Sequence, residues 1–333
     1  MAKILIIRFS SIGDIVLASP VFRCIKQQLA DSEIHLVTKK SFAMVTAHNP
    51  YIDQFFYLDD DLDGLITLLK KENYDHVVDL HNNFRSIKIK RALNVKSSTI
   101  KKLSLQKILL TQLNINVMPG RHISLRSLDA VACLGVKDDG KGLDYFIAPQ
   151  DEVPANDIPT SHVLGFIALV IGASYFTKKL PLHKLQALCA NIDFPIMLIG
   201  GPEDKAVAEA IAASDPVKIY NACGKFTLNE SADLIKKSKL VISHDTGMQY
   251  IACAYQKRIL AIWGATSPAL DVEPFFGTHA VNDGFNFKNI SVNTWCQPCS
   301  KYGQDKCPLD HFNCMEKQDV VAIAKQALAT LRR

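Results

Sequence analysis

The chain has 333 residues, of which 48% are hydrophobic and 21% charged, and it carries a formal net charge of +5. This composition is that of a soluble globular protein, and no apolar run reaches the roughly 20 residues that cross a bilayer. The N-terminal residues also lack the ordered segments of a secretory signal, so we expect a cytoplasmic protein. The length suits two domains, each with its own core.

Apolar strands alternate with helical segments in the first half of the chain. The pattern predicts strands over 4–9, 34–38, 54–58 and 76–80, and helices near 14–30, 62–72, 85–93 and 124–134. Pro20 lies close enough to the start of the first helix to kink its first turn. This alternation is typical of a parallel sheet with crossover helices.

A polar linker that contains prolines, 148–161, separates this half from a second alternation. Strands are then predicted over 163–170, 195–199, 217–220, 239–243 and 258–263, and an amphipathic helix over 317–331 ends the pattern. We therefore expect an α/β fold of two Rossmann-like, doubly wound domains that face each other across a cleft. The expected boundaries are 1–155 and 156–315, with a C-terminal helix, 316–333, that packs back toward the N-domain.

The segment Ser243-His-Asp-Thr-Gly-Met248 lies where a buried strand gives way to a helix. At a helix N-terminus, free N–H groups and the positive end of the dipole can hold phosphate oxygens without a metal. Asp245, Thr246, Gly247 and Met248 are therefore candidates for a diphosphate site. The alternative is an ordinary N-cap formed by Asp245 or Thr246.

Asp14 occupies the same kind of position in the first domain. It follows a strand and the turn Ser10-Ser-Ile-Gly13, so it lies at the carboxyl end of that strand, which faces the ligand in open parallel sheets. A carboxylate there can accept a proton from a substrate hydroxyl. It can also simply cap the following helix, and the sequence leaves both roles open.

Three further turns follow strands of the second domain, namely Gly172-Ala-Ser174, Gly200-Gly-Pro-Glu-Asp204 and Gly264-Ala-Thr-Ser-Pro268. Glycine at such positions lets the backbone approach a phosphate or a ribose closely. Asp204 could hold ribose hydroxyls, and Lys178 or Lys179 could neutralise a diphosphate. No G-x-G-x-x-G opens a helix after a strand, so a mononucleotide diphosphate is favoured over a dinucleotide.

Charge is distributed unevenly in the first domain. The stretch from Leu80 to Leu128 contains no Asp or Glu, whereas Lys and Arg recur throughout it. A solvated helical face is one explanation for such a run. An anionic lipid or a small anionic acceptor is the other, and it is favoured over nucleic acid because no aromatic stacking pattern accompanies the charge.

Two clusters contain residue types that bind metals. Asp59-Asp-Asp-Leu-Asp63 includes the D-x-D pattern of metal-dependent transferases, although acids at a helix start explain it better. Nine cysteines are present, and Cys296, Cys299, Cys307 and Cys314, with His311 nearby, are weak candidates for a structural zinc. The C-x6-C spacing of the second pair is unlike that of a zinc ribbon, so we expect neither a metal nor a cofactor.

Together these motifs resemble the heptosyltransferases of glycosyltransferase family 9 over nearly the whole chain. The resemblance rests on ILIIRFSSIGDIVLASPVFRCIK, YDHVVDLHNNFRS, KKLP, GGPED, CGKFTL, SHDTGM and WGATSP. It implies a GT-B fold and transfer of a heptose from ADP-heptose to the lipopolysaccharide inner core. The chain departs from the family at Tyr250, where a histidine is frequent, at Leu180, where a tryptophan is frequent, and in a shorter loop before Lys178. These departures leave the sugar open.

The resemblance also assigns roles to single residues. It implies that Asp14 is the catalytic base and that Lys178 contacts the diphosphate. The full set of donor candidates is Gly172, Ser174, Lys179, Asp204, Phe226, Asp245, Thr246, Gly247 and Met248. The acceptor candidates are Ser10, Ser11, Gly13, Arg85 and Arg121.

The expected reaction is an inverting, metal-independent glycosyl transfer. Asp14 deprotonates an acceptor hydroxyl, which attacks the anomeric carbon opposite the departing ADP, while Lys178 and helix amides stabilise the diphosphate. The expected partners are a nucleotide-sugar donor and an anionic lipopolysaccharide-type acceptor, with peripheral contact to the cytoplasmic face of the inner membrane and no nucleic acid. Two alternatives remain, a nucleotide-sugar epimerase or hydrolase of the same architecture and a non-catalytic nucleotide-sugar binding protein.

Overall fold

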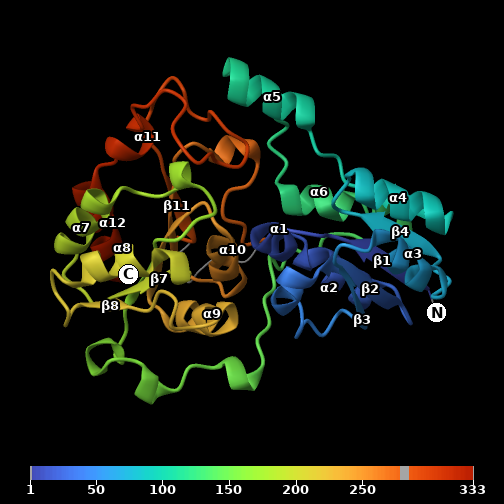
Figure 1. Ribbon diagram of the computed structural model, residues 1–333, viewed down its shortest axis with the longest axis horizontal. Helices are drawn as coiled ribbons and strands as arrows, with labels where there is room; N and C mark the ends of the chain where they lie inside the picture. Colours follow the sequence, from blue (N-terminus) through green and yellow to red (C-terminus); the bar gives the residue numbers. More distant parts are fainter. Residues whose placement is uncertain (1, 278–284, 333) are drawn as a thin grey trace. The chain divides into compact units, whose positions relative to one another are not determined.

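The structure is a computed structural model, and it describes residues 2–277 and 285–332. Helices and parallel strands alternate along this length (Figure 1). Within the two described ranges, no helix is both long enough and apolar enough to cross a bilayer.

The chain divides into two compact units. The first unit comprises the chain up to Leu103 together with Arg121–Phe146, and the second comprises Ser104–Gly120 together with the chain from Ile147 onward. The boundary expected after residue 155 stays a prediction. Ser104–Gly120 groups with the second unit, which the sequence pattern does not predict.

The first unit is a parallel sheet with helices on both faces. Its strands are β1 (Lys3–Ile7), β2 (Glu33–Lys39), β3 (Gln54–Leu58), β4 (His76–Asp79) and β5 (Lys96–Thr99), and its helices are α1 (Ile12–Leu17), α2 (Ser19–Gln28), α3 (Leu62–Lys70), α4 (Phe84–Leu93) and α6 (Ile123–Asp129). The strand order is β3-β2-β1-β4-β5, and every neighbouring pair is parallel. Ile4 and Ile6 of β1 pack into one apolar cluster with α2 and α6, and Leu5 and Ile7 pack into another with α3 and α4.

The second unit repeats this architecture with a larger sheet. Its strands are β6 (Ile167–Val170), β7 (Ile196–Ile199), β8 (Ile219–Asn221), β9 (Leu240–His244), β10 (Ile259–Ile262) and β11 (Phe287–Ile290), and its helices are α5 (Ser104–Leu113), α7 (Leu182–Ala190), α8 (Lys205–Ala212), α9 (Leu228–Lys237), α10 (Gly247–Ala254), α11 (Asn313–Glu316) and α12 (Val320–Leu331). The order is β11-β10-β9-β6-β7-β8, again with parallel pairs only. The doubly wound α/β architecture expected for each half is therefore confirmed.

Short 3-10 helices occupy several connections. They are η1 (Lys40–Val45), η2 (Ala132–Leu134), η3 (Pro149–Asp151), η4 (Ala155–Asp157), η5 (Thr160–His162), η6 (Phe176–Lys178), η7 (Pro202–Asp204) and η8 (Pro268–Leu270). Two of them, η6 and η7, follow the strands β6 and β7. They therefore lie at the carboxyl end of the second sheet, where ligands bind in open α/β folds.

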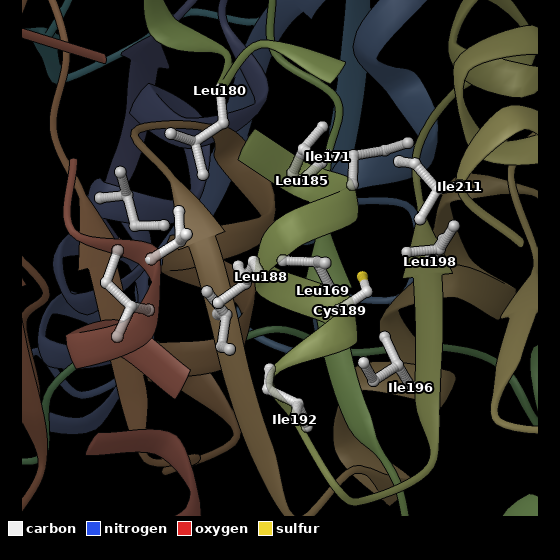
Figure 2. Packing of buried hydrophobic residues seen from close by; sticks show 14 of the residues in the cluster. Leu169, Ile171, Leu180, Leu185, Leu188, Cys189, Ile192, Ile196, Leu198 and Ile211 are labelled. Atoms are coloured by element: carbon white, nitrogen blue, oxygen red, sulfur yellow. The ribbon is translucent and has the colours of Figure 1, made fainter. Parts of the chain in front are cut away.

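Figure 2 shows the core on one face of the second sheet, where strand and helix side chains interdigitate. Leu169 of β6 and Leu198 of β7 meet Leu185, Leu188 and Cys189 of α7, and all five side chains are buried. Burying one such aliphatic side chain stabilises a fold by roughly 1.5–3 kcal/mol. The short apolar runs of the sequence are thus the strands that form the centre of the sheet.

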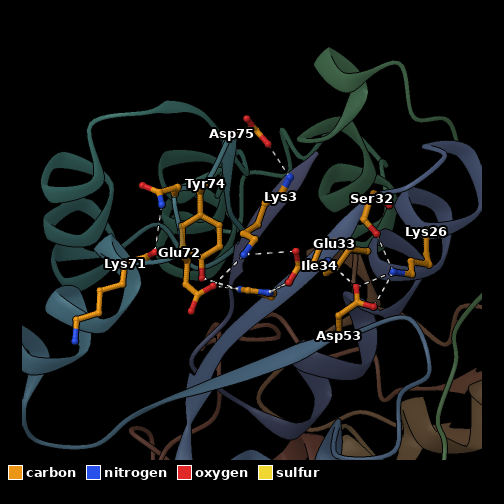
Figure 3. A network of polar contacts seen from close by, with 12 residues as sticks. Lys3, Lys26, Ser32, Glu33, Ile34, Asp53, Lys71, Glu72, Tyr74 and Asp75 are labelled. Carbon is orange, nitrogen blue, oxygen red and sulfur yellow. Dashed lines mark hydrogen bonds and ion pairs between the residues drawn. The ribbon is translucent and has the colours of Figure 1, made fainter. Parts of the chain in front are cut away.

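The amino edge of the first sheet is closed by paired polar groups (Figure 3). The Lys3 ammonium at the start of β1 lies 3.0 Å from Glu72 and 3.5 Å from Glu33. The buried His35 ring lies between the Tyr74 hydroxyl at 2.9 Å and the Glu33 carboxylate at 2.8 Å. These paired groups lie at the edge opposite the carboxyl ends of the strands, and it is at the carboxyl ends that ligands bind in open α/β folds.

Two predicted elements differ from the structure near their first residues. The helix expected over 14–30 is interrupted, because α1 ends at Leu17 and α2 begins at Ser19. Pro20 lies in the first turn of α2, where its missing N–H leaves no helix bond unmade. The strand expected from Val163 begins only at Ile167, because Gly165 takes a φ of +134° and Leu164 is 93% exposed.

The C-terminal helix is shorter than predicted. It begins at Val320, where the Asp319 carboxylate accepts a hydrogen bond from the Ala322 amide at 2.9 Å. Apolar residues of α12, among them Ile323 and Ala327, pack with α7 in the core of the second unit. The expected packing toward the N-domain stays a prediction.

Candidate active site

The turn after β1 fixes the Asp14 carboxylate by an ion pair and two hydrogen bonds. Its Oδ1 lies 2.5 Å from Nη2 of Arg8, and its Oδ2 accepts bonds from the Ser11 amide at 3.2 Å and the Ser11 hydroxyl at 2.9 Å. Arg8 also donates through Nη1 to the Leu80 carbonyl after β4. Burial alone would raise the pKa of Asp14, but the Arg8 charge and the Ser11 bonds outweigh it and hold that pKa below its usual value. Asp14 therefore makes the expected helix-start contact and is also ionised, as a general base must be.

Aromatic and basic side chains surround this turn. The His81 ring packs edge-on against Phe9 at 4.8 Å, and the Arg85 guanidinium lies 5.5 Å from the centre of the Phe9 ring. Burial, followed by the charges of Arg8 and Lys102, lowers the pKa of His81 to about 4. The imidazole is thus neutral at physiological pH. Sequence reasoning missed Arg8 and His81, although both follow the ends of buried strands, whereas Lys102 belongs to the basic stretch that was expected to face an anion.

The fully buried Asp79 stabilises the turn that carries His81. Its Oδ1 accepts the amides of His81 at 3.0 Å and Asn82 at 2.6 Å, and its Oδ2 accepts the Ser86 hydroxyl at 2.8 Å. The Lys90 ammonium lies 3.0 Å from the same oxygen. Asp79 therefore ties the turn after β4 to helix α4 through hydrogen bonds and an ion pair.

The predicted acceptor residues fall into two groups. Ser10 and Gly13 lie in the same turn as Asp14, and Arg85 contacts this turn through Phe9. Arg121 instead forms a two-point ion pair with Asp129, at 2.6 and 2.7 Å, on an exposed surface. Part of the basic run is thus neutralised by an acid just beyond its end, and the acceptor-binding roles stay predictions.

Acidic residues lie around the start of α3. Asp61 caps α3 by accepting the Gly64 amide at 2.8 Å, and Asp63 lies 2.6 Å from the Lys88 ammonium. Asp59 lies 4.0 Å from Lys40. Asp61 and Asp63 therefore lie at the helix start as expected, and the absence of a cation at this pattern stays a prediction.

In the second unit, Lys178 and Asp245 form an ion pair next to the N-terminus of α10. The Lys178 ammonium lies 2.7 Å from Oδ2 of Asp245, and both side chains are largely buried. The Thr266 hydroxyl donates to the same oxygen at 2.8 Å, and the Tyr250 hydroxyl lies 3.4 Å from Oδ1. The residue that departs from the family pattern, Tyr250, donates its single hydroxyl proton to the Val272 carbonyl at 2.7 Å and lies beside the carboxylate.

The first turn of α10 is capped by Thr246. Its hydroxyl accepts the Met248 amide at 3.4 Å, and Gly247 is the first residue of the helix. The N-cap interpretation of this segment is thus confirmed for Thr246. A cap and an anion site are compatible, because the positive end of the helix dipole remains at this position.

A second ion pair lies at the ends of β6 and β7. The Lys179 ammonium lies 2.7 Å from Oδ1 of Asp204, whose Oδ2 accepts the Gly201 amide at 3.1 Å. A Cβ atom added at Gly172 would lie 2.5 Å from Oδ2 of Asp204, and one added at Gly200 would lie 2.8 Å from it. The two turns therefore need glycine for the buried carboxylate to fit between them.

His244 fixes the segment that carries both lysines. Its Nε2 accepts the Leu180 amide at 3.0 Å, so the ring proton is on Nδ1. Burial, followed by the charges of Lys179 and Lys178, lowers the pKa of His244 to about 3. Sequence reasoning overlooked this residue, although it stands beside Asp245 in the quoted motif.

Two predicted donor residues stand apart from these ion pairs. Ser174 is exposed, and Phe226 is half-buried just before Thr227, the N-cap of α9. Among residues 2–277 and 285–332, no hydrogen bond joins either of them to the Lys178 or Lys179 pair. Their donor-binding roles stay predictions.

The cysteine-rich segment packs against the loop that carries Lys178. Thr177 exchanges backbone and side-chain hydrogen bonds with Gln304, at 2.8 to 3.1 Å. The amides of Cys299 and Ser300 both donate to the Ala265 carbonyl, at 3.0 and 3.1 Å. These hydrogen bonds therefore hold the loop next to Lys178 and the turn after β10 in place.

The four clustered thiols lie near one another without a closed ligand shell. Sγ of Cys296 lies 3.8 Å from Nε2 of His311. Burial, followed by the charges of Cys299, Cys296 and Cys307, raises the pKa of Cys314 to about 12. Among the described residues, no three of these groups converge closely enough to be the ligands of one ion. The weak zinc candidacy stays a prediction.

The family model of glycosyltransferase family 9 (heptosyltransferase) matches residues 64–309. Lipopolysaccharide heptosyltransferase 1 of Campylobacter coli is 26% identical over 288 residues, 79% of this chain and 84% of that protein. Lipooligosaccharide heptosyltransferase 2 of Haemophilus ducreyi is 25% identical, over 80% of this chain and 84% of that protein.

A similar fold occurs in the solved structure of the Escherichia coli ADP-heptose lps heptosyltransferase II. Its TM-score is 0.73 at 15% identity, and the match covers 99% of this chain and 98% of that one. The expected GT-B class is therefore confirmed, while the cleft expected between the domains stays a prediction. The chain is a glycosyltransferase and belongs to glycosyltransferase family 9, the heptosyltransferases.

Proposed function

We propose that this glycosyltransferase moves a heptose, or a related sugar, from an ADP-sugar to a hydroxyl of the lipopolysaccharide core, with inversion and without a metal ion. The observation that carries the proposal is the Lys178–Asp245 ion pair, which fixes a cation beside the N-terminus of α10. Fixed charges of this kind stabilise a leaving diphosphate most effectively, because they need no reorganisation during the reaction. The substrates are proposed from the names of the relatives and of the solved chain with a similar fold.

Asp14 is the proposed base of the first unit. Its carboxylate accepts the proton of the acceptor hydroxyl while the oxygen bonds to the anomeric carbon. A carboxylate with a low pKa is a weak base, so the proton moves late, once the attacking oxygen has become acidic. Arg8 and Ser11 keep the carboxylate oriented until then.

The second unit supplies the proposed electrostatic half of the reaction. As the glycosidic bond to ADP breaks, negative charge grows on the diphosphate. Lys178 and the amides of the first turn of α10 stabilise this charge, and Asp245 keeps the ammonium in position before the donor arrives. Lys179 and Asp204 would contact the ribose and the remaining phosphate oxygens.

The test is transfer by the purified chain from ADP-heptose to a lipopolysaccharide-core acceptor in the presence of a chelator, with the product anomer read by NMR. We expect inversion and full activity without divalent cations. Asp14→Asn should reduce turnover by roughly 10³-fold or more, which is the size of effect seen when a catalytic base is removed from an enzyme. Calorimetry should show that ADP binding is unchanged. Asp60→Asn, at an exposed acid before α3, is the matched control.

Three results would contradict the proposal. Asp14→Asn could keep wild-type turnover, the chelator could abolish transfer, or the donor could be consumed at the same rate without acceptor. The last result would identify the epimerase or hydrolase alternative. A comparison of thermal stabilisation by ADP-, UDP- and GDP-linked sugars tests the donor separately, since a ligand at 100 times its Kd stabilises by about 2.7 kcal/mol.

The remaining partners and the location belong to the same proposal. A nucleotide-sugar donor and an anionic glycolipid acceptor, with no nucleic acid, suit the basic run between Leu80 and Leu128. Such an acceptor places the chain in the cytoplasm, at the inner face of the membrane that carries the growing core. Cell fractionation with an antibody against the chain would test this location.

A further inference from the structure

Helix α5 exposes apolar side chains that the described structure leaves uncovered. Leu105 is 66% exposed and Ile108 is 45% exposed, and at a spacing of three residues they share one face of the helix. Leu113 at the end of the helix and Ile115 just beyond it are also exposed. Single exposed apolar residues are common, whereas a contiguous row of them marks an interaction site.

The cysteine-rich segment extends this apolar surface. The Asn114 side-chain amide donates to the Trp295 carbonyl at 3.3 Å, and the Lys301 ammonium lies 3.5 Å from the Ser104 carbonyl, so the segment contacts both ends of α5. Trp295 is 75% exposed, and Tyr302 is exposed as well. Indole and phenol rings of this kind favour the boundary between lipid and water, because one part of the ring is apolar and another is polar.

The charges next to this surface are mostly positive. Lys101 and Lys102 precede α5, Lys107 lies within it, and the segment from 80 to 128 contains no acid. On the neighbouring loop, Lys301 and Lys306 are balanced by Asp305 and Asp310, so the positive excess comes from the lysines in and before α5. Lysines that flank an apolar helix face are attracted to anionic lipid headgroups.

We propose that the α5 face, defined as Leu105, Ile108, Leu113, Trp295 and Tyr302, docks on an anionic lipid bilayer. The helix has 10 residues, so it extends only about 15 Å and lies in the interface, since a bilayer core is about 30 Å thick. Its apolar side chains enter the headgroup region, and the lysines contact lipid phosphates. Docking needs neither donor nor acceptor, so it is tested independently of the proposed function.

The test is sedimentation of the full chain with vesicles of phosphatidylethanolamine and phosphatidylglycerol (3:1), compared with vesicles of phosphatidylcholine alone. We expect binding to the anionic vesicles and at least tenfold weaker binding to the neutral ones. The double variant Leu105→Ser/Ile108→Ser should bind anionic vesicles at least tenfold more weakly, with an unchanged melting temperature. Val321→Ser, at an exposed position on α12, is the matched control and should bind like the wild type.

A second readout comes from the protein itself. The chain has two tryptophans, and Trp263 is fully buried, so a change in emission on adding vesicles reports on Trp295. We expect a shift to shorter wavelength with anionic vesicles that Trp295→Phe abolishes. Equal vesicle binding by the wild type and the double variant, or equal binding to both lipids, overturns the proposal. A dimer that the double variant dissolves also overturns it, since the occupant would then be a second copy of the chain.

Discussion

The ion pair between Lys178 and Asp245 offers the sharpest test of the candidate donor site. Lys178→Met keeps the length of the side chain and removes its charge. Asp245→Asn keeps an oxygen for the Thr266 hydroxyl but removes the charge that holds the ammonium. If the two residues act as one unit, the second substitution should add little to the first.

The expected magnitudes follow from burial and geometry. The Lys178 side chain is 13% exposed, the Asp245 side chain is 10% exposed, and the two groups are 2.7 Å apart. Breaking a fully buried pair costs about 3–5 kcal/mol. The Thr266 hydroxyl remains as a donor to Asp245, and both side chains keep some contact with solvent, so we expect Lys178→Met to lower the free energy of unfolding by about 2 kcal/mol.

The effect on turnover should be larger. A fixed donor aimed at a developing negative charge is worth about 3 kcal/mol, so Lys178→Met should reduce kcat by about 10² to 10³-fold. Asp245→Asn leaves the cation present but unfixed, and we expect a reduction of roughly 10 to 10²-fold. The double variant should match Lys178→Met within about twofold, because the carboxylate has no ammonium left to position.

The assay combines steady-state kinetics with ADP-heptose and urea unfolding of the same preparations. Lys218→Met is the matched control, because Lys218 forms a looser pair with Asp215, at 3.7 Å, on the surface of the same unit. We expect no change in turnover for that variant. Multiplicative losses in the double variant would refute the reasoning, since Lys178 and Asp245 would then act independently.

Three further predictions concern charge and pH. Arg8→Met removes the charge that outweighs burial at Asp14, so the pKa of this carboxyl rises, and the acid limb of the kcat/KM profile should move to higher pH than in the wild type. His244 has a pKa of about 3 in the folded chain, so its ring is neutral there. In the unfolded chain the ring takes up a proton below about pH 6.5. Because only the unfolded chain binds this proton, the contribution of His244 to the free energy of unfolding is present above about pH 6.5 and is lost as pH falls. At pH 5 that loss is about 2 kcal/mol. In urea titrations, the free energy of unfolding of His244→Gln should therefore fall by about 2 kcal/mol less than that of the wild type between pH 7 and pH 5. Arg23 is buried between Asp139 and Asp144, so Arg23→Met should lower the free energy of unfolding by about 3 kcal/mol, and a urea midpoint equal to that of the wild type would contradict this.

The sequence predicts the centre of each sheet better than its edges. The buried runs in β1, β6 and β9 are apolar on both faces, and a continuous apolar run is the signal of a covered parallel strand. The edge strands β5 (KSST) and β11 (FKNI) were missed because polar residues break this signal. The predicted strand from Val163 starts four residues before β6, since apolar character alone does not show where a chain leaves the core.

Candidate positions were predictable, but their partners were not. Asp14 and Asp245 could be identified because each follows a buried strand, and this places both at the carboxyl edge of a sheet. The contacts of Lys178 with Asp245 and of Leu180 with His244 join residues more than 60 positions apart. Such pairings depend on how the turns after β6 and β9 converge, and no local pattern encodes that.

The pairing of carboxylates also bears on how the proposed reaction neutralises its leaving group. A divalent cation such as Mg²⁺ needs carboxylate oxygens together with water or phosphate. Here Asp245 is paired with Lys178, Asp204 is paired with Lys179, and both oxygens of Asp14 accept hydrogen bonds or an ion pair. A cation at any of these acids would displace an ammonium or guanidinium group and leave it uncompensated. The arrangement therefore favours lysine and helix amides as the counter-charge of the diphosphate, and stimulation of turnover by millimolar Mg²⁺ would contradict that conclusion.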